Sequence, residues 1–249
     1  MTNGAPPGGD APRPPEPPPP LKRFYGTASV GPLVGGGATV LLDGRPIRTP
    51  ARAQLVAPPP VAEAMAAEWN AQEEHILPLT MPLTRLANTA VDGVANNMEP
   101  VCGEIVAIGS NDLLFYRADA PAGLVERQNA LWDPLVSHME GRLDVPIAVT
   151  AGIMPVYQAE AFPERLRALL PGEPLPLAAL HQLTTLTGSA LIALAVAEGV
   201  QTLDAGWEAA HVDEDWNIKE WGEDAEAAER RAVRRRDAEA AAFVLREML

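Results

Sequence analysis

The hydrophobic pattern of this 249-residue chain changes once, near residues 96–97, and that change limits the folds available to it. Before this point, short apolar and β-branched runs at residues 24–30, 38–42 and 45–48 alternate with turn signals, of which Asp43-Gly44 is the strongest. Two amphipathic helices follow, one opened by Pro58-Pro59-Pro60 and one over residues 83–94. Beyond residue 97, apolar residues recur at helical spacing. The fold class predicted is α+β, with a small antiparallel sheet and helices over residues 21–96 and an α-helical bundle over residues 97–249.

The second unit is expected to hold helices at residues 124–139, 162–170, 202–216 and 222–249, and one or two buried helices over residues 177–197. Its most apolar stretch, residues 186–197, is too short to span a bilayer and predicts a buried core helix that stops at Gly199. In the same stretch, we expect the small residues at Gly188 and Ser189 to form a helix contact and not a catalytic serine site. No membrane insertion is expected.

The first twenty residues differ from the rest, because nine of them are proline and three are glycine. Such a segment buries too little apolar surface to offset its ordering entropy, so residues 1–20 are predicted to be a disordered tail. It has neither the apolar core of a secretory signal nor the basic, acid-poor composition of a transit peptide. The expected location is therefore the cytoplasm of a bacterium, or the mitochondrial matrix if the chain is eukaryotic.

Charge and cysteine content exclude several classes of function. The chain has 19 Lys and Arg against 33 Asp and Glu, a formal charge of −14, which argues against nucleic acid as a partner. The single Cys102 excludes a disulfide framework and a cysteine-rich zinc site. The glycines at 31–37 precede a strand instead of a helix, and Glu73-Glu74-His75 lacks the second histidine of a zinc motif. We therefore expect no catalytic residue, metal site or cofactor.

The C-terminal third is unusual because three of the five tryptophans lie within fifteen residues of one another, among acidic side chains. Aromatic residues in an acidic setting are typical of a surface that binds a basic, partly apolar protein, although they also anchor helices to a core. A rival interpretation is a divalent-metal-dependent hydrolase that uses the acids Asp213 to Asp215. A solvated acidic face is a third. The residues concerned are Trp207, Asp213, Glu214, Asp215, Trp216, Glu220, Trp221 and Glu223.

Several segments, in this order and spacing, resemble a known family. The segments are residues 22–25 (KRFY), 42–50 (LDGRPIRTP), 67–72 (AEWNAQ), 82–90 (PLTRLANTA), 115–118 (FYRA), 128–134, 186–191 (LTGSAL), 213–216 (DEDW) and 221–224 (WGED). Together they resemble the assembly chaperones of the F-type ATP synthase that bind the free alpha subunit of the soluble catalytic head.

The resemblance implies a fold with a small α+β domain followed by a helical domain, and a chaperone function without enzymatic activity. It implies a monomer that holds the unassembled alpha subunit, prevents its aggregation and is displaced by the beta subunit. Two regions carry over as expected contacts with that partner. They are the helix bearing Glu68, Trp69 and Gln72 and the acidic segment bearing Asp213, Glu214, Trp216, Glu220, Trp221 and Glu223. For Trp69, a core position is the alternative.

Overall fold

The computed structural model describes residues 20–33, 36–152 and 154–249. The tail expected at residues 1–20 therefore lies, except for Pro20, outside the described residues. An antiparallel sheet of order β1-β2-β3 comes first, formed by β1 (Ala28–Pro32), β2 (Ala38–Leu42) and β3 (Arg45–Pro46). Asp43 and Gly44 join β2 to β3 with φ of 47° and 80°, the backbone that a tight hairpin turn requires. The turn expected at these two residues is confirmed.

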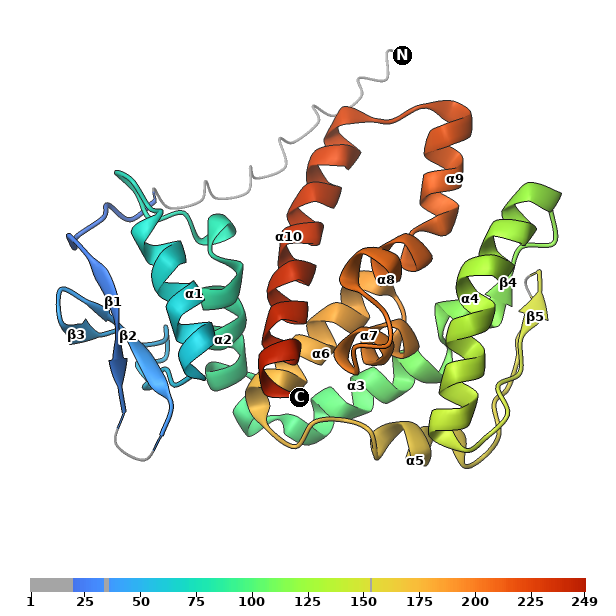
Figure 1. Cartoon of the computed structure of the whole chain (residues 1–249), viewed down its shortest axis with the longest axis horizontal. Helices are drawn as coiled ribbons and strands as arrows, with labels where there is room; N and C mark the ends of the chain where they lie inside the picture. The colour runs from blue at the N-terminus through green and yellow to red at the C-terminus, as the bar shows by residue number, and fades with distance from the viewer. Residues whose placement is uncertain (1–19, 34–35, 153) are drawn as a thin grey trace, which may run out of the picture.

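Helix α1 (Pro59–Asn70) packs against this sheet, and α2 (Pro82–Asp92) packs in turn against α1. The 3₁₀ turns η1 (Pro78–Thr80) and η2 (Val94–Asn96) lie around them. Both helices begin at a proline, as expected for a first turn that needs no N–H from that residue. The apolar face of α1 is fully buried at Val61, Ala62 and Met65. The sheet thus has one face covered by a helix (Figure 1).

Eight further helices make up most of the rest of the described chain. They are α3 (Met98–Ser110), α4 (Ala122–Leu143), α5 (Phe162–Arg167), α6 (Pro174–Thr187), α7 (Ala190–Ala197), α8 (Leu203–Ala210), α9 (Val212–Trp221) and α10 (Ala225–Met248). Between α3 and α5, the turn η3 (Leu113–Phe115) leads into β4 (Tyr116–Arg117), which pairs in parallel with β5 (Thr150–Ala151). The α+β class is confirmed. We expected only helices beyond residue 97, and this is wrong, because β4 and β5, of two residues each, form a short parallel pair there.

Two of the expected helical stretches are each divided in two. Residues 177–197, where one or two helices were expected, hold two: α6 ends at Gly188, which is left-handed at φ of 68°, and Ser189 caps α7 by accepting from the Ile192 N–H at 3.0 Å. Gly188 and Ser189 thus form a helix break and not the helix contact that we expected. The helix expected at 202–216 is interrupted at His211, so that α8 and α9 can turn relative to each other.

The helix α7 lies at the centre of the core. Its residues Ala190–Ala195 are all buried, and the fully buried Trp132 of α4 donates from Nε1 to the Ala209 carbonyl at 2.7 Å. The core is continuous from the sheet to α10, since α1 and α2 pack against α6 and α10. Within the described residues, no helix combines the length and the apolar character needed to cross a membrane.

Candidate partner-binding surfaces

The acidic, tryptophan-bearing segment forms a helical hairpin at one edge of the molecule. Helix α9 ends at Gly222, whose φ of 91° reverses the chain, and Asp224 caps α10 by accepting from the Ala227 N–H at 2.8 Å. The connection is therefore short and fixed at both ends. Figure 1 shows α9 and α10 rising from the bundle and joined by this connection.

One face of α9 packs inward, against α4. Asp213 accepts a hydrogen bond from Gln128 Nε2 at 2.7 Å, and the indole of Trp216 lies so close to Gly123 that a side chain there would clash with it. The Lys219 ammonium lies 5.5 Å from the Trp216 ring centroid. Asp213 and Trp216 therefore hold α9 in place, and their expected contact with a partner stays a prediction.

The other face of α9 lines a groove toward α10. Glu214, Ile218 and Trp221 are spaced at i, i+4 and i+7, which places them on one side of the helix. With residues 222–224 and Ala227, Ala228 and Arg231, they enclose a groove of about 470 Å³. Trp221 is 87% exposed, so its indole is presented to solvent and not to the core.

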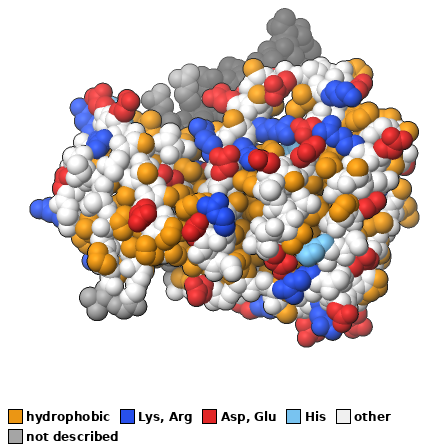
Figure 2. Space-filling view, viewed as in Figure 1, with side chains coloured by type: hydrophobic (Ala, Val, Ile, Leu, Met, Phe, Trp, Pro, Cys, Tyr) orange, Lys and Arg blue, Asp and Glu red, His pale blue; other side chains and the backbone are white. Residues whose placement is uncertain are grey.

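The groove carries a surplus of negative charge. Arg231 is paired with Asp215 at 2.6 Å, whereas Glu214 and Glu223 have no ion pair within the described part of the chain. Figure 2 shows positive and negative side chains mixed across the upper part of the face, over α9 and α10. Glu220 is exposed but does not line the groove. The sequence reasoning missed Ile218, although its four-residue spacing from Glu214 was a usable signal.

The three consecutive acids do not converge on a common point. Asp213 bonds to α4, Asp215 bonds to Arg231 on α10, and only Glu214 faces the groove. Successive residues on a helix point about 100° apart, which explains this divergence. Among residues 20–33, 36–152 and 154–249, no cluster of three His, Cys, Asp or Glu could hold a metal ion. The hydrolase interpretation based on Asp213 to Asp215 therefore has no supporting geometry.

The second expected contact region holds the first unit together. The carboxylate of Glu68 accepts from the N–H groups of Leu83 and Thr84 at 2.7 and 2.9 Å and from the Thr84 hydroxyl at 2.8 Å, which caps the start of α2. Burial raises the pKa of Glu68, and these hydrogen bonds oppose that rise. Gln72 is only 4% exposed and binds the Leu77 N–H through Oε1 at 2.8 Å. Both side chains have internal roles.

Trp69 is only partly buried. Its ring meets that of Tyr25 edge to face at 5.5 Å between centroids, and the Tyr25 hydroxyl donates to the Trp69 carbonyl at 2.6 Å. The ring also forms part of the wall of a surface pocket beside the sheet. Trp69 therefore combines a packing role with access to a pocket.

An exposed aromatic side chain in an acidic groove is typical of surfaces that recognise other proteins. The model of the ATP12 chaperone protein family matches residues 22–140. The Atu1473 protein from Agrobacterium tumefaciens is 44% identical, with a TM-score of 0.87 over 92% of this chain and 86% of that one. Atp12 from Paracoccus denitrificans is 37% identical, with a TM-score of 0.83 over 90% of this chain and 97% of that one, and a point mutant of it matches equally. This chain belongs to the ATP12 chaperone family, which confirms the resemblance in its sequence.

Proposed function

We propose that this protein binds the unassembled alpha subunit of the F-type ATP synthase, prevents its aggregation and releases it when the beta subunit joins. The observation that supports this most strongly is its membership of the ATP12 chaperone family, with a shared fold over 92% of the chain. The proposal includes action as a monomer. It also includes a location where the subunits are made or assembled, the cytoplasm of a bacterium or the mitochondrial matrix.

The physical need for such a protein follows from subunit assembly. An alpha subunit without its beta neighbour exposes a large apolar interface, and such surfaces self-associate. A protein that covers this interface has to bind it yet yield to the beta subunit. A contact of moderate size, with charged groups that can exchange partners, suits that requirement.

We propose the α9–α10 groove as a contact for the alpha subunit. Trp221 supplies exposed aromatic area, and Glu214 and Glu223 supply negative charge without a cation of their own within the described residues. An apolar segment that carries Lys or Arg would complement both properties. Glu220 extends the negative charge outside the groove, and Trp69 remains a proposed contact on the first unit.

The test is charge reversal at half-buried Glu214, in the groove, and at exposed Glu220. The double variant Glu214→Lys/Glu220→Lys should weaken capture of the alpha subunit by at least tenfold in a pull-down titration, while its melting temperature stays that of the parent. The matched control is Glu63→Lys/Glu160→Lys, which makes the same charge change at exposed positions distant in sequence. Unchanged capture by the first variant, or equal loss in both, would refute the groove as the contact.

A further inference from the structure

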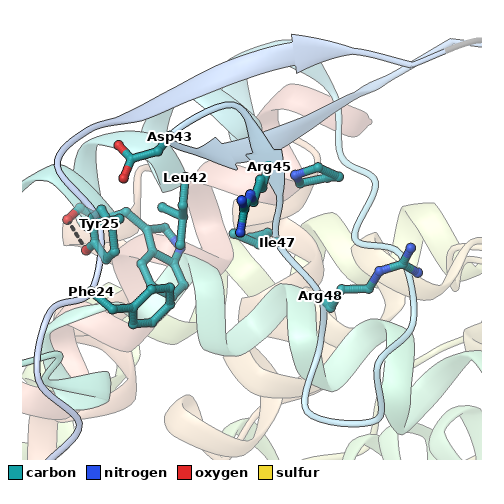
Figure 3. A pocket seen from close by; sticks show the side chains of 9 residues that line it. Phe24, Tyr25, Leu42, Asp43, Arg45, Ile47 and Arg48 are labelled. Atoms are coloured by element: carbon teal, nitrogen blue, oxygen red, sulfur yellow. Dashed lines mark hydrogen bonds between the residues drawn. The ribbon is translucent and has the colours of Figure 1, made fainter.

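A second surface lies beside the sheet, and its exposed charged side chains include two arginines, in contrast to the acidic α9–α10 groove. A pocket of about 510 Å³ is formed where the segment before β1, the β2–β3 turn and the end of α1 meet. Figure 3 shows Phe24 and Tyr25 on one side of it and Arg45 and Arg48 on the other. Leu42 and Ile47 form its apolar floor, and Trp69 completes the wall.

Most polar side chains around this pocket already have an internal partner. The Asp43 carboxylate accepts from the N–H groups of Gly26 and Thr27 at 3.0 and 2.9 Å, and these bonds lower the pKa of Asp43. Arg23 donates to the carbonyls of Tyr25 and Gly26 at 3.1 and 2.7 Å. These groups fix the shape of the pocket and are not available to a ligand.

Three exposed side chains on the pocket wall remain open to a ligand. Arg45 and Arg48 make no ion pair within the described ranges of the chain, and Arg48 donates one hydrogen bond to the Arg52 carbonyl at 3.4 Å. Phe24 is 67% exposed, although it is one of only four phenylalanines. The indole N–H of Trp69 is buried and has no hydrogen-bond partner among the residues described. A buried donor without a partner costs free energy.

The segment that supplies most of the pocket wall is positively charged, although the chain as a whole is negative. Residues 21–57 contain five cations and one carboxylate, 5 − 1 = +4, in a chain whose formal charge is −14. The cations are Lys22, Arg23, Arg45, Arg48 and Arg52, and the carboxylate is Asp43. A concentration of positive charge beside an aromatic and aliphatic wall favours a ligand that has carboxylates next to apolar side chains.

We infer that this pocket, called here the sheet pocket, docks a short peptide segment in which acidic residues alternate with large apolar ones. Arg45 and Arg48 pair with the carboxylates of the segment, and Phe24 and Trp69 contact its apolar side chains. That this segment belongs to the alpha subunit rests on the proposed function. The chemistry of the pocket does not, and it can be tested without that subunit.

The probe is a fluorescein-labelled peptide of sequence Asp-Leu-Asp-Phe-Asp-Leu-Asp, compared with the same peptide carrying Lys at each Asp. Binding to the full chain is followed by anisotropy at low salt. The indole N–H signal of Trp69 is followed by NMR and assigned by its loss in Trp69→Phe. Because the whole protein is negative, repulsion disfavours the acidic peptide everywhere else. We expect it to bind and to shift the Trp69 signal, and the lysine peptide to leave that signal unmoved.

Variants separate this pocket from the rest of the surface. Arg45→Glu/Arg48→Glu should weaken the acidic peptide at least tenfold, and Phe24→Ser should weaken it with the charges intact. The control Arg52→Glu/Arg236→Glu makes the same charge change at exposed positions outside the pocket, and should change affinity less than twofold. All variants are checked by thermal unfolding, and Arg45 and Arg48 are exposed, so their replacement should leave the melting temperature unchanged.

Several results would overturn the inference. One is an acidic peptide that fails to bind, and another is a double pocket variant that binds it as tightly as the parent. A third is a Trp69 signal that responds to ATP or inorganic phosphate but not to the peptide, which would assign the pocket to a small anion. Trp221→Ala should leave peptide binding unchanged. If the acidic peptide does not bind, the proposed capture of the alpha subunit is not refuted. If the alpha subunit is not captured, the inference about the sheet pocket is not refuted.

Discussion

Replacing Asp112 by asparagine should change how the stability of the protein depends on pH. Asp112 is fully buried, and its two carboxylate oxygens accept from the Leu114 and Leu191 N–H groups, each at 3.1 Å. It thereby ties the turn η3 to the start of α7 at the centre of the core. Burial raises the pKa of Asp112 from 3.8 to about 6, although hydrogen bonds from Ser189 and from three backbone N–H groups oppose the rise.

The sign follows from proton binding in the two states. Because the pKa is higher in the folded state, the folded protein binds more protons than the unfolded one between about pH 4 and 6. Stability from this group therefore falls as pH rises through that window. A shift of about two pKa units corresponds to about 3 kcal/mol in all, of which about 2 kcal/mol is lost between about pH 4.5 and 7. Asparagine has no such titration.

The asparagine variant has a cost of its own. Its amide NH₂ must face one of the two backbone N–H groups that the carboxylate now accepts from, which leaves a buried donor without a partner and costs about 1–3 kcal/mol at every pH. The measurable quantity is thus the difference in unfolding free energy between the two proteins. From pH 4.5 to 7, we expect this difference to move by about 2 kcal/mol in favour of the variant.

The assay is urea unfolding followed by tryptophan fluorescence at pH 4.5, 5.5 and 7. Burial lowers the pKa of His211, and the contribution of this group to stability is the same in both proteins and cancels in the difference. The matched control is Asp119→Asn, the same substitution at an exposed position. If the curves of parent and Asp112→Asn run parallel, the carboxylate does not titrate in this window and the reasoning is wrong.

Three further substitutions test the roles assigned to individual side chains. Glu68→Ala removes the cap that receives the Leu83 and Thr84 N–H groups, and should cost about 1–2 kcal/mol in thermal or urea unfolding; an unchanged melt would contradict the capping role. Trp69→Ala should cost about 3 kcal/mol and lower the melting temperature by several degrees, whereas an unaltered melting temperature would make Trp69 a surface contact only. Trp221→Ala should stay within about 0.5 kcal/mol of the parent because the ring is 87% exposed, yet lose at least tenfold in alpha-subunit capture; full capture would remove Trp221 from the contact.

Local signals in the sequence predicted the hairpin turn and the two helices at the start of the chain, whereas the strand expected at residues 24–30 lies at Ala28–Pro32. The Asp43-Gly44 turn and the prolines that open α1 and α2 act within a few residues, so their effect can be read from the sequence. The break at Gly188 was harder, because the apolar residues on either side of it are continuous in pattern. Helix α3 was not predicted. Gly103 and Gly109 lower its intrinsic helix propensity, and Gly109 is there because a side chain would clash with Leu166 of α5.

The roles of the candidate site residues depend on partners that are distant in the sequence. Glu68 looks like a surface acid until the start of α2 is seen fifteen residues on, and Asp213 looks solvated until Gln128 of α4 is placed against it. The β4–β5 pair also depends on residues that are distant in the sequence. A two-residue strand is too short to show alternating hydrophobicity, so its formation is decided by the packing around it. Sequence alone therefore found the acidic segment but could not divide it into a packed face and an open one.

The central claim is capture of the alpha subunit, and co-expression tests it most directly. The protein is produced together with the ATP synthase alpha subunit of its own organism, with and without the beta subunit, and soluble alpha subunit is followed by gel filtration. We predict that the alpha subunit becomes soluble in a complex with this protein, and that the beta subunit dissolves the complex. An alpha subunit that stays insoluble, with no complex formed, would contradict the proposed function.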